Sequence, residues 1–428
     1  MIKEVVNARK QNMRLYSFYR SISLDLLFFY AIEFIFLTQV KKITPSEVVL
    51  STSFYAIFMI FLQIPASIIV DKVGARKCTI VANIFNAIYV LLIIFICNNI
   101  KDLIFAQLIS AMCYSLKDIS DDMLLTQSIP ETSKKGEIFS KLEGKGFRNY
   151  YIVDSIGAIL SGSMYVINPY APIIISLIFV IIATIISFGF KDIEKTKIKH
   201  AEVKIENKRH YFKELKDAMK FIIKSQRLRS LFVYTGISWG IFALMGTYRS
   251  SILVDIGVPT QMITVIAAIV GIAASLGSKG QLAFNKRFKN KSLTIILLSV
   301  TTAIIIAGLT VVLNIQYVIS IIIISLCFII ISVDKGMSLV LSSRYLGNFS
   351  SDKILSQIYA VNAISKNIFR ALIGFVGSYL LDITTTANSM IIVGLFMIII
   401  SISLIGYMKT RLGLKPEQYG KEEIYNKI

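Results

Sequence analysis

The sequence predicts an all-α polytopic membrane protein whose twelve transmembrane helices form two pseudo-symmetric bundles of six. Hydrophobic residues make up 55% of the 428-residue chain and charged residues only 17%, with a mean hydropathy of +0.68. A soluble protein of this size cannot bury so much apolar surface, and uncharged runs of about 20 residues can cross a bilayer as helices. These runs lack strand-like alternation, which argues against a transmembrane barrel.

Twelve such runs lie in two groups of six on either side of one long connection. We expect spans near 17–40, 47–70, 77–98, 102–125, 138–167, 171–190, 230–255, 260–284, 292–313, 317–345, 353–381 and 388–408. The predicted domains are an N-terminal bundle over 1–190, a basic cytoplasmic linker over 191–229, and a C-terminal bundle with its tail over 230–428. The first run is too long for a signal-peptide core and no small-residue cleavage site follows it, so we expect it to be retained.

The linker contains apolar residues at helical spacing between its lysines. They are Tyr211, Phe212, Leu215, Met219, Ile222 and Ile223. This pattern is typical of an amphipathic helix lying on the inner leaflet. A solvated linker that is helical only at its end would give the same pattern, and both interpretations stay open.

The distribution of lysine and arginine indicates the topology. The formal net charge is +20, and the bases gather in both terminal arms and in every second connection. The connections at 168–170, 256–259 and 314–316 are nearly free of them, whereas Lys41, Lys42 and Lys101 are exceptions. Because bases concentrate on the cytoplasmic side of membrane proteins, we expect a plasma-membrane protein with both termini in the cytoplasm. The positive charge therefore does not predict a nucleic-acid partner.

The short connection between the second and third spans combines an acid, a glycine and two bases, D-x-x-G-x-R-K over 71–77. Gly74 allows a turn that a side chain would hinder. The carboxylate of Asp71 could reach the positive N-terminal end of another helix. The segment 350–352 offers such an end at the eleventh span, where it has the composition of an N-cap.

Twelve spans in two halves, with this loop between the second and third, resemble the major facilitator superfamily. The family's loop reads G-x-L-A-D-R-x-G-R-R; here the acid, the second glycine and an arginine match, while Lys72 replaces an arginine and Ser67 the first glycine. A decayed counterpart occurs at 280–287. The resemblance implies alternating access, in which a cytoplasmic gating motif is formed by Asp71, Gly74, Arg76 and Lys77. A charged turn without a gating role is the alternative.

Ionisable residues are unevenly distributed among the spans. Spans 6, 9 and 12 are nearly pure hydrocarbon, whereas spans 1, 4, 5, 7, 10 and 11 contain charges. Charges in a bilayer are costly and usually face a cavity or a partner. In the resembled fold every third helix faces lipid and the others surround a central pathway, which agrees with this distribution. We therefore expect a proton-coupling and central-cavity group made of Asp25, Glu33, Arg148, Asp154, Asp334, Lys335, Lys366 and Arg370.

Glu33 is the best candidate for a proton carrier within this group, because burial favours the neutral form of a carboxylic acid. A Glu33 side chain permanently paired with a base is the alternative. Bases slightly outnumber acids at mid-membrane depth, which favours an anionic or zwitterionic substrate. We expect Asp121 and Asp122 at the membrane edge, in a structural role.

The chain lacks the motifs of several other classes. No phosphate-binding G-x-x-x-x-G-K-[ST] loop occurs. Only His200 and His210 could supply imidazole ligands, both lie in the linker, and the four cysteines have no metal-binding spacing. We expect no enzyme activity, no cofactor and no metal.

The predicted function is a monomeric bacterial secondary transporter that moves a small organic solute with a proton or other ion gradient. Proton-coupled efflux of drugs or toxic compounds, as an antiporter, is one form of this function. The antiporter motif of the fifth span is incomplete, because 157–162 has two of its glycines and no proline. Uptake of an organic anion or zwitterion, and a non-transporting membrane sensor on the same fold, are the alternatives.

Overall fold

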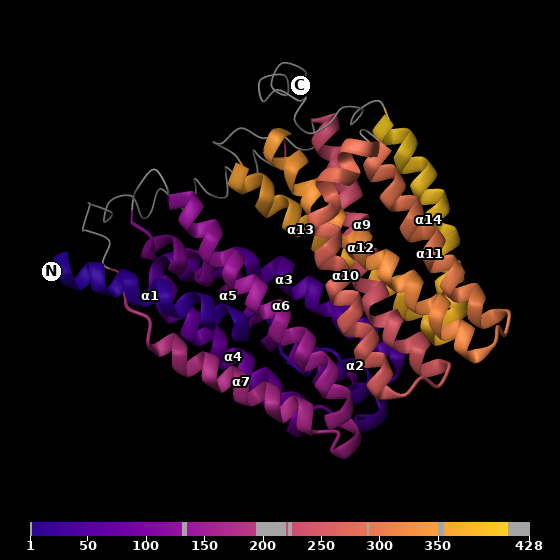
Figure 1. The fold of residues 1–428 in the computed structure, drawn as a ribbon, viewed down its shortest axis with the longest axis horizontal. Coiled ribbons are helices and arrows are strands. Elements are labelled where there is room, and N and C mark those ends of the chain that lie inside the picture. Colours follow the sequence, from indigo (N-terminus) through magenta and orange to yellow (C-terminus); the bar gives the residue numbers. More distant parts are fainter. Residues whose placement is uncertain are drawn as a thin grey trace. The chain divides into compact units, whose positions relative to one another are not determined.

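The computed structural model describes residues 2–130, 135–193, 220, 225–288, 291–349 and 355–409, and within these ranges the regular structure is entirely helical. The chain divides into two compact units (Figure 1). One comprises Met1–Ile198 with Pro259–Ala268, and the other Lys199–Val258 with Ile269–Ile428. The predicted amphipathic helix, apart from residue 220, and the predicted cap at 350–352 lie outside the described residues.

The helices follow the predicted spans closely. The first half contains α1 (Ile2–Ser23), α2 (Glu33–Ile35), the π-helix η1 (Phe36–Val40), α3 (Pro45–Val73), α4 (Ala75–Phe95), α5 (Ile100–Ser128), α6 (Lys135–Ile167) and α7 (Ala171–Phe188). The second half contains α9 (Gln226–Asp255), α10 (Thr260–Phe288), α11 (Ser292–Val312), α12 (Tyr317–Phe349), α13 (Leu355–Ile383) and α14 (Thr386–Lys409).

Local sequence explains where several helices begin. Thr44 caps α3 by accepting the N–H of Glu47, while the Glu47 carboxylate accepts the N–H of Thr44, and Pro45 occupies the first helical position. Asn99 caps α5 in a similar way, accepting from two backbone N–H groups. Gly74 separates α3 from α4 at φ +97°, a conformation that residues with a side chain rarely adopt.

The first span is not the continuous helix predicted over 17–40. The helix α1 begins at Ile2 and ends at Ser23, and residues 24–32 are non-helical before α2 starts. Asp25 explains part of the break, because its carboxylate accepts the N–H of Leu26 at 3.2 Å. Phe28 has a positive φ of 69°, and the Leu27 carbonyl accepts a hydrogen bond from the hydroxyl of Ser176 on α7. Side chains thus replace helical hydrogen bonds inside an apolar segment.

Nine helices of the described residues are long and apolar enough to cross a membrane, namely α3, α4, α6, α7, α9, α10, α11, α12 and α14. Two further helices, α5 and α13, have 29 residues each but carry more polar side chains. The first span is divided by the break at 24–32. This is the helix content of a multi-pass membrane protein.

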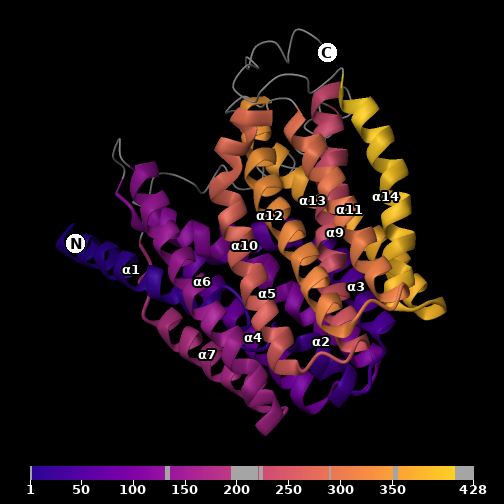
Figure 2. The same cartoon turned by 45° about the vertical axis from the view of Figure 1, so that its right-hand side comes forward.

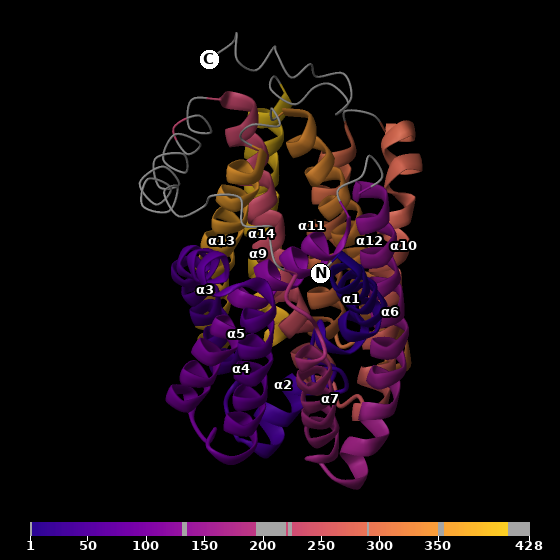
Figure 3. The same cartoon turned by 90° about the vertical axis from the view of Figure 1, so that its left-hand side faces the viewer.

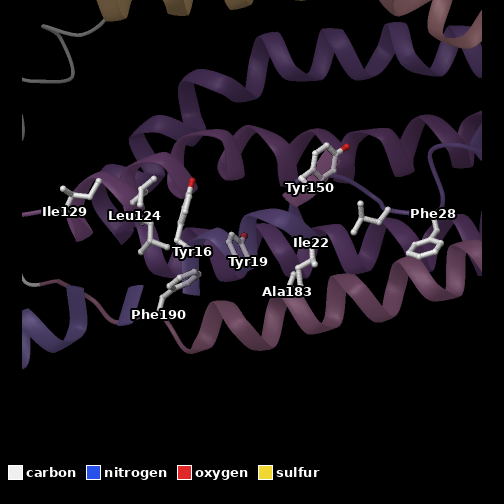
Figure 4. Close-up of a cluster of buried hydrophobic side chains, with 12 residues drawn as sticks. Tyr16, Tyr19, Ile22, Phe28, Leu124, Ile129, Tyr150, Ala183 and Phe190 are labelled. Carbon is white, nitrogen blue, oxygen red and sulfur yellow. The ribbon is translucent and has the colours of Figure 1, made fainter. Parts of the chain in front are cut away.

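In the first unit α3 and α4 pack on α5, α6 packs on α1, and α7 lies along α4 and α1 (Figure 3). Apolar and aromatic side chains fill the space around α1 (Figure 4). Tyr19 and Phe190 meet edge to face there, with ring centroids 5.3 Å apart. This core fixes the C-terminal part of α1 against the segment that follows α7.

In the second unit α13 packs on α9, and α11 lies between α12 and α14 (Figure 2). The approach of α13 to α9 depends on two glycines one turn apart. A Cβ at Gly236 would lie 2.2 Å from the Phe369 ring, and one at Gly240 would lie 2.9 Å from the Phe369 carbonyl oxygen. Small residues at this spacing let two membrane helices come into backbone contact.

Candidate functional site

Asp25 lies in the break of the first span, where tyrosine hydroxyls from two other helices reach it. Tyr114 on α5 donates to one carboxylate oxygen at 3.1 Å, and Tyr150 on α6 donates to the other at 3.4 Å. The hydroxyl of Tyr30 lies 3.4 Å from that of Tyr114. Within the described residues Asp25 forms no ion pair, so its hydrogen-bond donors are all neutral groups.

The other predicted residues of the first half do not gather around Asp25 in ion pairs. Glu33, half-buried at the start of α2, accepts a hydrogen bond from the hydroxyl of Tyr89 on α4 at 3.2 Å. Asp154 on α6 is also half-buried, whereas Arg148 is exposed. In the part of the chain that the structure describes, Arg148 makes no ion pair with any of these carboxylates.

A buried ionic network lies nearby and was not predicted. Asp121 accepts from Arg20 at 3.3 Å and from Lys117 at 3.2 Å, and Arg20 also pairs with Glu143 at 3.1 Å. The side chain of Asp121 is wholly buried among these partners. The membrane-edge position expected for Asp121 stays a prediction. The i,i+4 spacing of Lys117 and Asp121 was the available signal. Arg20 is one of the bases of the N-terminal arm, whose positive charge indicates topology.

Neutral groups complete this network. The ammonium of Lys117 donates to the hydroxyl of Tyr19 and, at 3.1 Å, to the amide oxygen of Asn83, and Thr79 donates to Asp121 at 3.1 Å. The contacts therefore join α1, α4, α5 and α6. Charges removed from water need such complete partnering, which indicates a rigid anchor for the first unit.

The predicted gating motif surrounds the turn between α3 and α4. Arg76 pairs with Asp192 at 3.0 Å and donates to the carbonyl of Phe188 at 3.2 Å, which attaches the turn to the end of α7. Asp71 and Lys77 are exposed. A cavity of 240 Å³ opens here. Its lining includes Asn12, Asp71, Gly74, Arg76, Lys191 and Asp192.

The start of the linker is held at the same place. The side chain of Asn12 on α1 donates to the Lys191 carbonyl at 2.9 Å and accepts the Lys191 N–H at 2.8 Å. Gln11 donates to the Gly189 carbonyl at 2.7 Å. The motif turn, the N-terminal helix and the beginning of the linker thus form one polar cluster in the first unit.

In the second unit two predicted lysines come together at Trp239 on α9. The ammonium of Lys366 on α13 lies 5.3 Å from the indole centroid, and that of Lys335 on α12 lies 5.9 Å from it. Both distances are in the range of a cation–π contact. The structure therefore joins these two lysines through an aromatic ring.

The remaining predicted residues of the second half occupy different positions. Asp334 is 5% exposed, and one of its carboxylate oxygens is buried without a hydrogen-bond partner among the described residues. Arg370 is half-buried on α13. Asn362, which shares a face of α13 with Lys366 and Arg370, accepts a hydrogen bond from Thr235 at 2.9 Å and so helps to join α9 to α13.

Comparison with known proteins identifies the family. The family profile described as Major Facilitator Superfamily matches residues 18–334. No curated protein matches the chain. Among solved structures, the nucleoside transporter NupG is similar with a TM-score of 0.68 at 12% identity, covering 94% of this chain and 99% of that one.

Two further structures have the same fold. A bacterial homolog of the human lysosomal transporter Spinster, in an inward-facing and occupied conformation, gives a TM-score of 0.66 at 12% identity over 96% of this chain and 98% of its own. A D-xylose–proton symporter gives 0.62 at 10% identity, over 92% and 97%. At these identities the likeness concerns the fold, because one fold can serve many substrates.

Proposed function

Because the chain belongs to the major facilitator superfamily, we propose that it is a secondary active transporter of a small organic solute that works by alternating access. The fold class and the multi-pass helices agree with this function. The charged side chains inside the spans support it further, because ionisable groups at membrane depth usually serve a ligand or ion pathway. We place the protein in a bacterial plasma membrane as a monomer. Both termini are assigned to the cytoplasm, because lysine and arginine gather in the terminal arms and in every second connection.

Proton coupling is the form of energy input that we propose. The observation that supports it is the neutral partnering of Asp25, whose carboxylate receives hydrogen bonds from Tyr114 and Tyr150. A carboxylate held by hydroxyls can take up a proton without leaving a cation unpaired, unlike a carboxylate in an ion pair. Glu33, which accepts from Tyr89, is the second proton site in this proposal.

We assign the motif Asp71, Gly74, Arg76 and Lys77 to the control of the cytoplasmic side. The contacts of Arg76 with Asp192 and Phe188 support this role, because they connect the motif turn to the chain segment that leads out of the first unit. A change of state that moved this segment would have to break an exposed ion pair, which requires little energy.

Transport in proteoliposomes tests the proposal. The purified protein is screened for ligands by thermal shift, and each ligand found is assayed for counterflow and for accumulation under a pH gradient of either sign. We expect solute exchange in the counterflow assay. The sign of the pH gradient that drives accumulation then distinguishes proton-coupled efflux from proton-coupled uptake. Bound ligands without any exchange would instead identify a sensor on a transporter fold.

Variants of the carboxylates test the coupling separately. We expect Glu33→Gln and Asp25→Asn to lose accumulation driven by the pH gradient while they retain counterflow, because exchange of solute needs no net proton movement. A matched control is Asp102→Asn, since Asp102 lies in the first turn of α5. Unchanged accumulation in both carboxylate variants would contradict proton coupling through the first span.

A further inference from the structure

Trp239 is the single tryptophan of the chain, and the ammonium groups of two lysines lie within 6 Å of its ring. At 1.5 Å per residue, Trp239 stands about 20 Å along α9 and Lys366 about 16 Å along α13, counted from their first residues. The hydrocarbon core is about 30 Å thick, and both residues lie in the middle third of helices that are longer than this core. The positive charge of Lys366 at this depth requires an explanation.

The neighbouring contacts hold the three residues in place. Gly236 and Gly240 flank Trp239 and bring α13 into contact with α9 at Phe369, one turn beyond Lys366. Thr235 donates to Asn362, and the hydroxyl of Tyr234 lies 3.3 Å from that of Ser338 on α12. These contacts fix α9 against α12 and α13 at the level of Trp239, so the three residues project from packed helices, as a binding site requires.

No carboxylate of the described residues lies within ion-pair distance of Lys366. Asp334, the residue next to Lys335 in the chain, is buried and forms no ion pair within the described ranges. The positive charge of Lys366 is thus not balanced by an ion pair with any acid among the described residues of the second unit. An anionic ligand would offset the cost of this charge in the membrane.

We propose that Trp239, Lys335 and Lys366 bind an aromatic carboxylate as the substrate. The carboxylate would accept charge-assisted hydrogen bonds from the two ammonium groups, and its ring would pack against the indole. This inference rests on the proposed transport function, for which it names the substrate class. It narrows the sequence-based expectation of an anionic or zwitterionic substrate to one chemical class.

Tryptophan fluorescence tests the site directly, because no other tryptophan contributes to the signal. The full-length protein is titrated with benzoate, with benzyl alcohol as the neutral analogue and cyclohexanecarboxylate as the non-aromatic anion. We expect a saturable fluorescence change with benzoate and weaker responses to the two analogues. Lys366→Gln and Lys335→Gln should each weaken the response to benzoate about tenfold or more, which is the effect of losing one charge-assisted hydrogen bond.

Two variants control for structural effects. Lys366→Arg keeps the charge and should retain most of the affinity, whereas Lys101→Gln removes an exposed lysine at the start of α5 and should bind benzoate normally. The site would be overturned if benzoate caused no fluorescence change. It would also be overturned if a folded Lys366→Gln variant bound benzoate as tightly as the native protein does. Equal affinity for cyclohexanecarboxylate would overturn its aromatic component.

Counterflow of labelled benzoate separates this inference from the transport function. Fluorescence saturation without exchange would contradict transport and leave the binding site intact. Exchange of a different solute, with no fluorescence response to benzoate, would contradict the aromatic-carboxylate site and leave transport intact.

Discussion

Lys117 and Asp121 form an ion pair of 3.2 Å one helical turn apart on α5, and both side chains are almost completely buried. Within the described residues, their charges are satisfied by each other and by neighbours from α1 and α4. The free energy of the pair is therefore small when both partners are present and strongly unfavourable when one is missing.

We predict that Lys117→Met destabilises the protein by roughly 3–5 kcal/mol, because Asp121 loses its ammonium partner and keeps, among the described residues, the ion pair with Arg20. The measurement is the thermal midpoint in detergent, which should fall by several degrees. Lys117→Met combined with Asp121→Asn should lose less stability than the sum of the two single changes. Strict additivity, or a Lys117→Met midpoint equal to that of the exposed control Lys101→Met, would contradict a coupled buried pair.

The pair of Arg76 and Asp192 should behave in the opposite way. Both side chains are partly exposed, so Arg76→Ala should cost less than about 1 kcal/mol of stability. If the motif controls the cytoplasmic side, transport in proteoliposomes should nevertheless fall severalfold. Asp192→Asn should reproduce the loss, and the double variant should add little to it. Normal transport in both single variants would show that this contact has no part in gating.

Gly74 provides a test of backbone strain alone. Its φ of +97° disfavours a side chain, although no atom lies within 4 Å of the position a Cβ would occupy. Gly74→Ala should therefore destabilise the protein by about 1–3 kcal/mol through the backbone. Gly246 lies within α9 and has equal space around it, so Gly246→Ala should be neutral or stabilise by up to about 1 kcal/mol. Equal thermal midpoints for the two variants would contradict the positive-φ requirement.

The spans and the turn at Gly74 could be predicted from the sequence because they depend on local properties. Apolar length and the composition of short connections are read directly along the chain. The break at residues 24–32 could not be predicted, since the segment contains no proline or glycine and reads as an apolar helix. It depends on groups distant in sequence, such as Ser176, which donates to the Leu27 carbonyl.

The same distinction applies to the contacts of the candidate site residues. The face shared by Asn362, Lys366 and Arg370 follows from helical spacing, but the partner of Lys366 is an aromatic ring on another helix. Charge counting groups Arg20 with the other bases of the N-terminal arm, because composition does not show which way a side chain packs; the structure buries it against Asp121. Lys41, an exception to the charge pattern, is buried in the structure and donates to the Ile94 carbonyl at 2.7 Å.

Alternating access requires that water reach the charged residues of the spans from each side in turn. Cysteine labelling measures this directly, and the four native cysteines are buried, so their background reaction should be low. Asp154→Cys and Ser365→Cys, each at a half-buried position, are treated with a membrane-impermeant reagent from either face, with and without ligand. We predict labelling from both faces, with rates that the ligand changes in opposite directions. Positions that stayed unreactive from both faces under every condition would contradict a water-accessible transport pathway.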